Sequence, residues 1–248
     1  MLKSEGGILM ETCIEVNRLT KAFHGRNVVD DLTFHIQSGE VFGLLGHNGA
    51  GKTTTIETIL GLHQPTGGKA MIYGLEAKRH RKTLFEKIGV QLQTSFYQDN
   101  IKVKEVLEET AALYQHPADY QELLQRFQMD TFANQYVEKL SGGERQKLSV
   151  IAALLPNPQI LFLDELTTGL DVAARREVWN ILKDLKDQGM TIVLTTHYME
   201  EAEYLCDHIL LMKNGKRMIE GTVEEVLKSG SYKNLEEAYL SIMKEEQV

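Results

Sequence analysis

A glycine-rich loop that ends in lysine and threonine is the segment of this sequence whose chemistry is easiest to infer. The residues Gly46-His47-Asn48-Gly49-Ala50-Gly51-Lys52-Thr53 match the pattern G-x-x-x-x-G-K-[ST] in full. Glycines there let a loop wrap closely around phosphate, and the first N–H groups of the following helix point at the anion. Lys52 can reach β- and γ-phosphates, and the Thr53 hydroxyl can hold Mg²⁺. The pattern predicts a phosphate-binding loop that extends to Thr54.

The second candidate is an apolar run, Ile160–Leu163, that ends in the two carboxylates Asp164 and Glu165. In phosphoryl transfer to water, the first carboxylate would complete the magnesium shell, and the second would orient or deprotonate the attacking water. A buried strand that ends in Asp-Glu is common on its own. The catalytic interpretation therefore depends on the phosphate-binding loop upstream.

A third motif, Leu140-Ser141-Gly142-Gly143-Glu144, stands before the helical run Arg145–Leu155. Its simplest interpretation is a helix start with a serine N-cap, which any helical bundle could use. A glycine-bearing helix N-terminus is also a second phosphate-binding end. One phosphate group hardly needs two such ends in the same subunit.

The elements that must position these motifs indicate an α/β fold. Short runs rich in Val, Ile, Phe and Thr predict strands, and continuous apolar runs are typical of parallel strands buried on both faces. The strands are expected at Cys13–Val16, Leu32–Ile36, Val41–Leu45, Ile160–Leu163 and Thr191–Thr195.

Helical spacing and turn signals complete the predicted order of elements. A helix is expected over Lys52–Leu60 with Gly61 as its stop, and the segment 94–135 has helical spacing at Lys104–Tyr114 and Tyr120–Phe127. Asn214-Gly215 predicts a hairpin between Ile209–Met212 and Lys216–Ile219, Thr222 and Glu225 predict a capping box, and Asn234–Glu246 predicts a final amphipathic helix.

With these three motifs in this order, the chain resembles the ABC ATPase family over essentially its whole length. LSGGE is similar to the family's signature. The resemblance implies an α/β P-loop NTPase core with an N-terminal antiparallel β part and an inserted helical lobe at about 94–155. It also implies a head-to-tail dimer that holds ATP and Mg²⁺ between the phosphate-binding loop of one subunit and Ser141, Gly142 and Gly143 of the other.

The resemblance assigns roles to positions that carry little signal alone. Phe23 matches the aromatic residue that stacks on adenine, although it would otherwise be interpreted as core. Gln93 matches the glutamine that senses Mg²⁺ and the transport partner, with Gln91 as a nearby rival. Asp171 matches the loop that links the two ATP sites. His197 matches the switch histidine that contacts the γ-phosphate, whereas a lone histidine at a strand end is more often structural.

One position departs from the family pattern. Leu166 stands where these proteins usually have proline after the Asp-Glu pair. Leucine supplies an N–H and a freer φ angle. Because Glu165 is present, hydrolysis is still expected.

Composition limits where the protein acts and what it binds. The net charge of −8 argues against a nucleic-acid partner, and the two cysteines are far apart, which suits a reducing compartment. No apolar run approaches the roughly 20 residues of a membrane span, and the start is not a secretory signal. Residues 1–10 are expected to be a flexible leader, with Met1 or Met10 as the true start, and 11–248 a single domain.

The favoured function is therefore the ATPase subunit of an ABC transporter on the cytoplasmic face of the membrane. Its partners are expected to be a separate permease and a second ATPase subunit, identical or closely related. The sequence is most similar to ATPases of bacterial exporters for drugs, peptides or other hydrophobic cargo. The alternatives are a soluble ABC ATPase of translation or DNA repair, which usually has two cassettes or long coiled coils, and a regulator that does not hydrolyse ATP, against which Glu165 and His197 argue.

Overall fold

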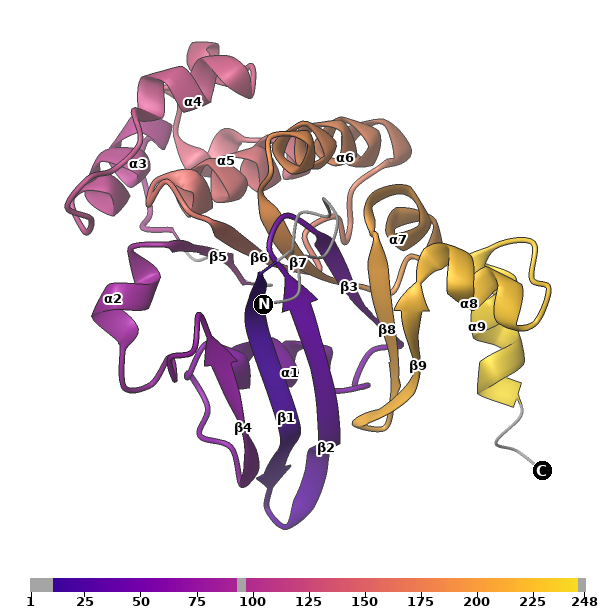
Figure 1. Ribbon diagram of the computed structural model, residues 1–248. Coiled ribbons are helices and arrows are strands. Elements are labelled where there is room, and N and C mark those ends of the chain that lie inside the picture. Colours follow the sequence, from indigo (N-terminus) through magenta and orange to yellow (C-terminus); the bar gives the residue numbers. More distant parts are fainter. Residues whose placement is uncertain (1–10, 93–96, 245–248) are drawn as a thin grey trace, which may run out of the picture.

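The computed structural model describes residues 11–92 and 97–244, which form two β-sheets and a set of helices (Figure 1). The strands are β1 (Thr12–Phe23), β2 (Arg26–Gln37), β3 (Val41–Leu45), β4 (Gly67–Ile72), β5 (Ile88–Gln91), β6 (Ile160–Asp164), β7 (Thr191–Thr196), β8 (His208–Lys213) and β9 (Lys216–Thr222). The α-helices are α1 (Lys52–Ile59), α2 (Arg81–Phe85), α3 (Val103–Ala111), α4 (Tyr120–Arg126), α5 (Gly142–Leu154), α6 (Val172–Asp187), α7 (Met199–Leu205), α8 (Val223–Ser229) and α9 (Leu235–Lys244).

The N-terminal part is an antiparallel sheet of order β2-β1-β4. In the pairing of β1 with β2, the residues nearest the turn are Phe23 and Arg26, so only His24 and Gly25 lie between the two strands. Both residues have positive φ, 47° and 78°, as the two-residue turn that matches strand twist requires. The predicted antiparallel β part is thus confirmed, with longer strands than the sequence indicated.

The larger sheet has the order β5-β6-β7-β3-β8-β9 and is parallel except for β9. The register places Asp164 of β6 beside Thr195 of β7, and Leu45 of β3 beside Thr196. The carboxyl ends of β3, β6 and β7 therefore reach the same edge. Ligands of open α/β sheets bind at that edge, where the loops leave the strands.

Alternation along the strands divides the core into two clusters on opposite faces of this sheet. Phe162 and Val193 pack with α1 and the antiparallel sheet. Their neighbours Leu161 and Ile192 pack with the helices α5, α6 and α7. Successive residues of a strand point to opposite faces, so unbroken apolar runs are needed when both faces are covered. As a result, α1 and α5 lie on opposite sides of the sheet (Figure 1).

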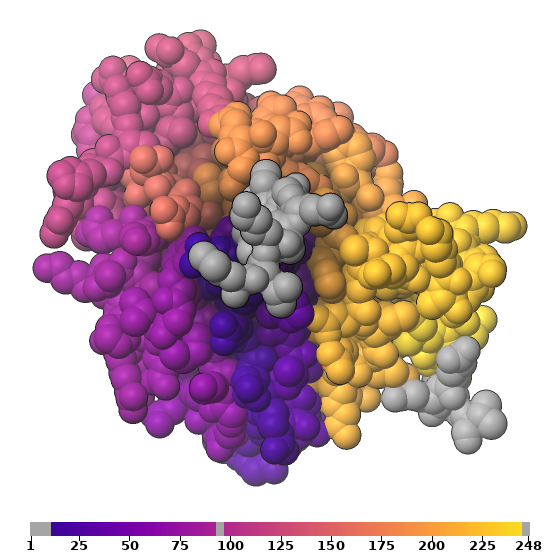
Figure 2. Space-filling model, in the orientation of Figure 1, coloured from indigo at the N-terminus to yellow at the C-terminus, as the bar shows by residue number. Residues whose placement is uncertain are grey.

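The helices α3, α4 and α5 form a lobe at one corner of the molecule, and α8 and α9 lie on the opposite side (Figure 2). The lobe is helical as predicted. Helices α3 and α4 are shorter than the spacing indicated, and α5 starts earlier, at Gly142. The hairpin of β8 and β9 turns at Asn214 and Gly215 with φ angles of 50° and 80°, and Thr222 and Glu225 form the predicted capping box. Strands β4 and β5 and helices α2, α6 and α7 had not been predicted.

Three sequence-based expectations touch residues outside the described ranges. The leader, residues 1–10, and Gln93 lie there entirely. The last helix is described from Leu235 to Lys244, so the expected end at Glu246 falls outside as well. Among the described helices, none is long and apolar enough to cross a bilayer.

Candidate functional site

The phosphate-binding loop connects β3 to α1 and is held by backbone hydrogen bonds. Gly51 has φ +104°, and a Cβ atom there would lie 2.5 Å from the Val28 carbonyl oxygen, so only glycine fits without movement. The Ala50 N–H donates to the His47 carbonyl at 3.1 Å, and the Gly215 N–H donates to the Ala50 carbonyl at 2.9 Å. The turn of the β8–β9 hairpin therefore supports the loop from outside.

Lys52 occupies the centre of the site and is almost fully buried. Its ammonium donates to the carbonyl oxygens of Gly46 at 2.8 Å and His47 at 3.2 Å, and its Nζ lies 3.1 Å from Glu165 Oε1. Both side chains of this ion pair are less than a tenth exposed. A buried cation needs such partners because burial disfavours the charged form. The structure thus brings together the two residues that the sequence assigned to phosphate and to water.

Asp164, at the end of β6, is the most buried carboxylate of the site. Its Oδ1 accepts hydrogen bonds from the hydroxyls of Thr53, at 3.2 Å, and Thr195. Its Oδ2 is buried and has no hydrogen-bond partner among the described residues. Burial raises the pKa of the Asp164 carboxyl above its ordinary value, against the opposing effect of both hydroxyls. A buried carboxylate with an unused oxygen beside a threonine hydroxyl fits the oxygen ligands that Mg²⁺ prefers.

The raised pKa of Asp164 leads to a prediction for Asp164→Asn. The folded chain holds this proton more tightly than the unfolded chain. The resulting loss of folding free energy is absent below the ordinary pKa of 3.8, grows as pH rises from 3.8 to the raised pKa, and is complete above it. Without nucleotide or Mg²⁺, Asp164→Asn should therefore melt higher than the parent at pH 8, by about 2–4 °C for each kcal/mol relieved. Calorimetry checks this, with the exposed Asp184→Asn as control. A lower melting temperature at pH 8 would contradict the prediction.

Glu165 begins the loop after β6 and has an unusual backbone. Its φ is +50°, a left-handed conformation that is uncommon for residues other than glycine and often marks functional sites. The Glu165 N–H donates to Thr195 Oγ1 at 3.0 Å, which fixes the turn against β7. Its Oε2 lies 3.7 Å from Nδ1 of His197, the residue that follows β7. That nitrogen is buried and lacks a hydrogen-bond partner among the described residues.

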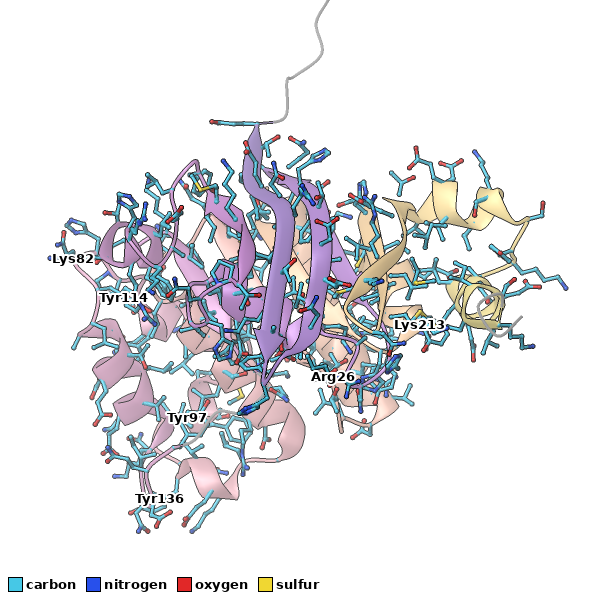
Figure 3. All side chains as sticks on the ribbon, turned by 90° about the horizontal axis from the view of Figure 1, so that it is seen from below. Arg26, Lys82, Tyr97, Tyr114, Tyr136 and Lys213 are labelled. Atoms are coloured by element: carbon cyan, nitrogen blue, oxygen red, sulfur yellow. The ribbon has the colours of Figure 1, made fainter. Side chains whose placement is uncertain are left out.

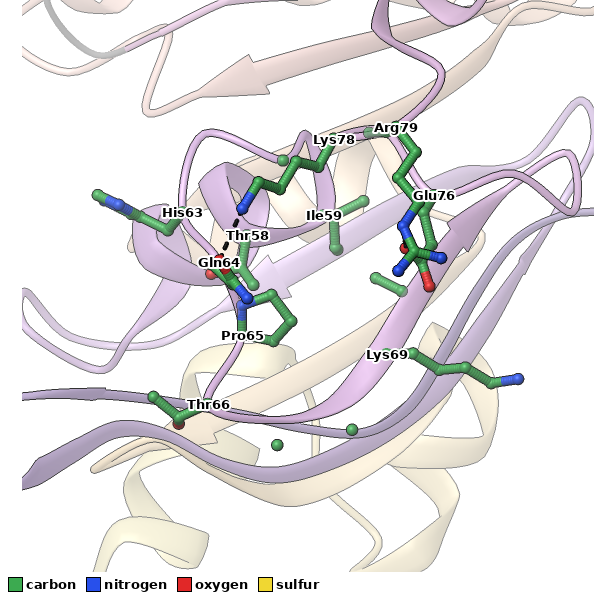
Figure 4. A pocket seen from close by; sticks show the side chains of 15 residues that line it. Thr58, Ile59, His63, Gln64, Pro65, Thr66, Lys69, Glu76, Lys78 and Arg79 are labelled. Carbon is green, nitrogen blue, oxygen red and sulfur yellow. Dashed lines mark hydrogen bonds and ion pairs between the residues drawn. The ribbon is translucent and has the colours of Figure 1, made fainter.

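Phe23 lies at the end of β1 and is partly exposed, so the interpretation as a core residue is wrong. The rings of Phe23 and His63 pack in a T-shaped arrangement with centroids 5.2 Å apart, and Lys21 Nζ lies 4.6 Å from the centroid of the Phe23 ring. His63 also lines a cavity of about 490 Å³ between α1 and β4 (Figure 4). A supported, partly exposed ring is suited to stacking.

The signature residues lie on the other face of the sheet from α1. Ser141 caps α5 and forms a reciprocal capping box with Glu144, as its simplest interpretation predicted. Ser141 and Gly142 are exposed. A Cβ at Gly143 would lie 3.2 Å from Ala174, in the first turn of α6. Asp171 caps α6 by accepting from the Ala174 N–H at 2.9 Å. The signature and Asp171 are thus brought together with each other, on the face of the sheet opposite α1.

The expected glutamine sensor, Gln93, lies outside the described residues. The rival Gln91 is buried in β5, and its amide donates to the Leu92 carbonyl at 2.6 Å. Tyr97, at the start of the next described range, is half-buried against the core on the helical-lobe side (Figure 3).

Sequence reasoning missed two polar residues of this region. Thr195 binds both Asp164 and the backbone of Glu165. Glu201, in α7, is a buried carboxylate that accepts hydrogen bonds from two other elements. The register of β6 against β7, which places Thr195 beside Asp164, could have identified Thr195. No local pattern distinguishes Glu201 from the nearby acidic residues Glu200 and Glu203.

Comparison with known proteins agrees with this geometry. The family model described as "ABC transporter" matches residues 29–168. The Nod factor export ATP-binding protein I of Rhizobium leguminosarum bv. viciae is 38% identical over 229 residues, which cover 89% of this chain and 72% of the relative. The protein of the same name from Paraburkholderia xenovorans is 37% identical over 224 residues, covering 88% and 74%.

Solved structures agree as well. An ATP-binding subunit of an ABC transporter superposes with a TM-score of 0.84 at 29% identity, covering 94% of this chain and all of that one. A dimeric bacterial ABC transporter cassette superposes with a TM-score of 0.74 at 26% identity, covering 84% and 98%. The chain belongs to the ABC transporter family and is an ATP-binding, ATP-hydrolysing subunit of that family.

Proposed function

We propose that this chain hydrolyses ATP at a site completed by a second ATPase subunit, and that it powers export through separate membrane subunits. The observation that carries the proposal is the meeting of Lys52, Asp164 and Glu165 at one edge of the sheet. A buried cation, a carboxylate with an unused oxygen and a second carboxylate are the groups that phosphoryl transfer to water requires.

Lys52 and Glu165 change partners when ATP binds. The β- and γ-phosphates attract the ammonium that Glu165 holds at 3.1 Å. Glu165 is then released to accept a proton from water, whose oxygen attacks the γ-phosphorus as the bond to ADP breaks. The Thr53 hydroxyl and Asp164 would hold Mg²⁺, with Gln93 as a further ligand, and the bound ion would neutralise phosphate charge.

The remaining assignments follow the family resemblance and the exposure of each side chain. The partly exposed ring of Phe23 stacks on adenine, and His197 contacts the γ-phosphate through its imidazole. The loop N–H groups from Gly46 to Thr54 surround the phosphates. Ser141, Gly142 and Gly143 of the second subunit cover the γ-phosphate, and Asp171 connects the two sites.

Export is supported by the relatives, which are named for Nod factor export. The cargo class proposed is a drug, a peptide or another hydrophobic molecule. The partners are a separate permease and a second ATPase subunit, identical or closely related, at the cytoplasmic face of the membrane. Nucleic acid is not among them, because the chain carries a net charge of −8.

The variant Ser141→Arg tests the two-subunit site. It should bind ATP almost normally, since α5 and α1 lie on opposite faces of the sheet, and it should lose hydrolysis because the bulky side chain blocks the partner's γ-phosphate. Mixing it with Lys52→Ala restores one complete site per mixed dimer, so the mixture should regain partial activity. ATP titration, phosphate release and ATP-dependent dimerisation are measured together.

The matched control is Ser231→Arg, the same change at an exposed serine between α8 and α9. It should bind and hydrolyse like the parent chain. If Ser141→Arg alone hydrolyses ATP at the parent rate, the signature of a second subunit does not complete the site. If the mixture forms ATP-dependent dimers without turnover, both sites must act together.

A further inference from the structure

A buried carboxylate outside the reaction centre joins three elements of the site. Glu201, in α7, is 4% exposed. Its Oε1 accepts a hydrogen bond from the Thr167 hydroxyl at 2.7 Å and another from the Trp179 indole N–H at 2.7 Å. Thr167 belongs to the loop after Glu165, and Trp179 belongs to α6. One oxygen atom thus connects this loop, α6 and α7.

This arrangement does not resemble an ordinary buried ion pair. Among the described residues, no Lys, Arg or His lies within ion-pair distance of Glu201, and both donors are themselves buried. Burying a carboxylate is costly unless hydrogen bonds satisfy it, and hydrogen bonds to a charged group are stronger than neutral ones. The Glu201 carboxylate therefore holds Thr167 and Trp179 firmly, because moving either donor away would leave the buried carboxylate without a hydrogen bond.

The three elements that meet at Glu201 carry the residues of the reaction. The loop that contains Thr167 starts at Glu165, whose left-handed φ of +50° must be held by its surroundings. The Thr168 N–H donates to the Glu165 carbonyl at 3.1 Å, which closes the loop into a turn. Helix α7 starts directly after His197 and its N-cap Tyr198. Helix α6 starts at its cap Asp171.

We propose that Glu201 is a positioning residue that sets the relative placement of Glu165, His197 and Asp171. The inference rests on the proposed function, because those three residues are the base, the switch and the link between sites. Glu201 touches none of the reacting atoms. Its effect reaches them through Thr167 on one side and through the first turn of α7 on the other, and it holds Glu165 Oε2 at 3.7 Å from His197 Nδ1.

The alternative is that Glu201 only stabilises the fold. Both interpretations predict lower thermal stability when the carboxylate is lost. They differ in turnover, measured well below the melting temperature. A misplacement of about 1 Å can cost about 10²-fold in rate, whereas a folded enzyme that is merely less stable keeps its kcat.

The test compares Glu201→Ala with Glu201→Gln, whose amide oxygen can still accept both hydrogen bonds. Glu201→Ala should lower kcat roughly 10–100-fold while KM and the titrated ATP affinity stay within about twofold, because Lys52 and its loop are untouched. Glu201→Gln should recover most of the rate. The control is Glu200→Ala, an exposed neighbour in the same helix that pairs with Arg176. Trp179, the one tryptophan of the sequence, reports the junction by its fluorescence, which should shift in Glu201→Ala.

A second pair keeps the test decisive if Glu201→Ala does not fold. Thr167→Val has almost the same shape without the hydroxyl, and Thr167→Ser keeps the hydroxyl. Lower kcat in the valine variant with near-parent kcat in the serine variant supports the inference. Equal kcat in both overturns it.

Failure of the proposed function would look different. In that case the parent chain does not hydrolyse ATP, or Ser141→Arg alone hydrolyses it at the parent rate. If Glu165→Gln is inactive while Thr167→Val is fully active, the proposed function holds and the positioning role of Glu201 is wrong.

Discussion

Lys52→Ala should weaken ATP binding by at least about 10²-fold. The substitution removes the buried ammonium that faces the β- and γ-phosphates, and a hydrogen bond to each of these two charged groups contributes about 1.5–3 kcal/mol. It also leaves the buried Glu165 without the cation that lies 3.1 Å away. The melting temperature should fall as well, because breaking a buried pair costs about 3–5 kcal/mol. Calorimetric titration with ATP and Mg²⁺, well below the melting temperature, measures the loss of affinity.

Two further variants separate the loss of phosphate contacts from the loss of stability. Lys228→Ala removes an exposed lysine that pairs with Glu224, and it should bind ATP like the parent. The double variant Lys52→Ala with Glu165→Gln removes the unpaired charge. It should regain melting temperature without regaining ATP affinity. Undiminished ATP affinity in Lys52→Ala would rule out the phosphate-binding assignment of this loop.

Glu165→Gln should keep ATP binding and lower turnover by roughly 10²–10⁴-fold, the usual contribution of a general base. Glutamine keeps the shape and can still accept a hydrogen bond from Lys52, so the loop should stay in place. Because binding proceeds and hydrolysis does not, the variant should accumulate as an ATP-bound dimer. Single-turnover phosphate release and size-exclusion chromatography with ATP measure the two effects.

The control for this variant is Glu177→Gln, a mostly exposed carboxylate of α6 that pairs with Lys147. It should turn over like the parent chain. Parent-like hydrolysis in Glu165→Gln would mean that another group activates the water. His197, whose Nδ1 lies 3.7 Å from Glu165, is the next candidate.

The sequence predicts those parts of the fold and site whose signal is local. Gly51 must be glycine because of its own φ and its close approach to Val28, and this need appears in the motif. Asn214-Gly215 predicts its turn because both residues adopt positive φ. Apolar runs such as Ile160–Leu163 predict strands because both faces of the sheet are covered.

What the sequence does not predict depends on partners far apart in the chain. β4 is a glycine-containing, partly exposed strand whose pairing with β1 defines it. The role of Thr195 depends on the register of β6 against β7, and that of Glu201 on the packing of α6 against α7. The partial exposure of Phe23 depends on its place at the end of β1, next to the β1–β2 turn, and on its ring contact with His63. None of these contacts can be predicted from the type of a residue and its neighbours in the sequence alone.

The placement of α1 and α5 on opposite faces of one sheet has a consequence for how cells lose ATP. On the proposed two-subunit site, a solitary copy of this chain holds the nucleotide by its phosphate-binding loop, while its own Ser141 lies on the other face of the sheet. A solitary copy is therefore expected to hydrolyse little ATP. The rate of ATP consumption should follow the number of paired copies and not the abundance of this polypeptide, so the chain could be made in excess without draining the cell's ATP.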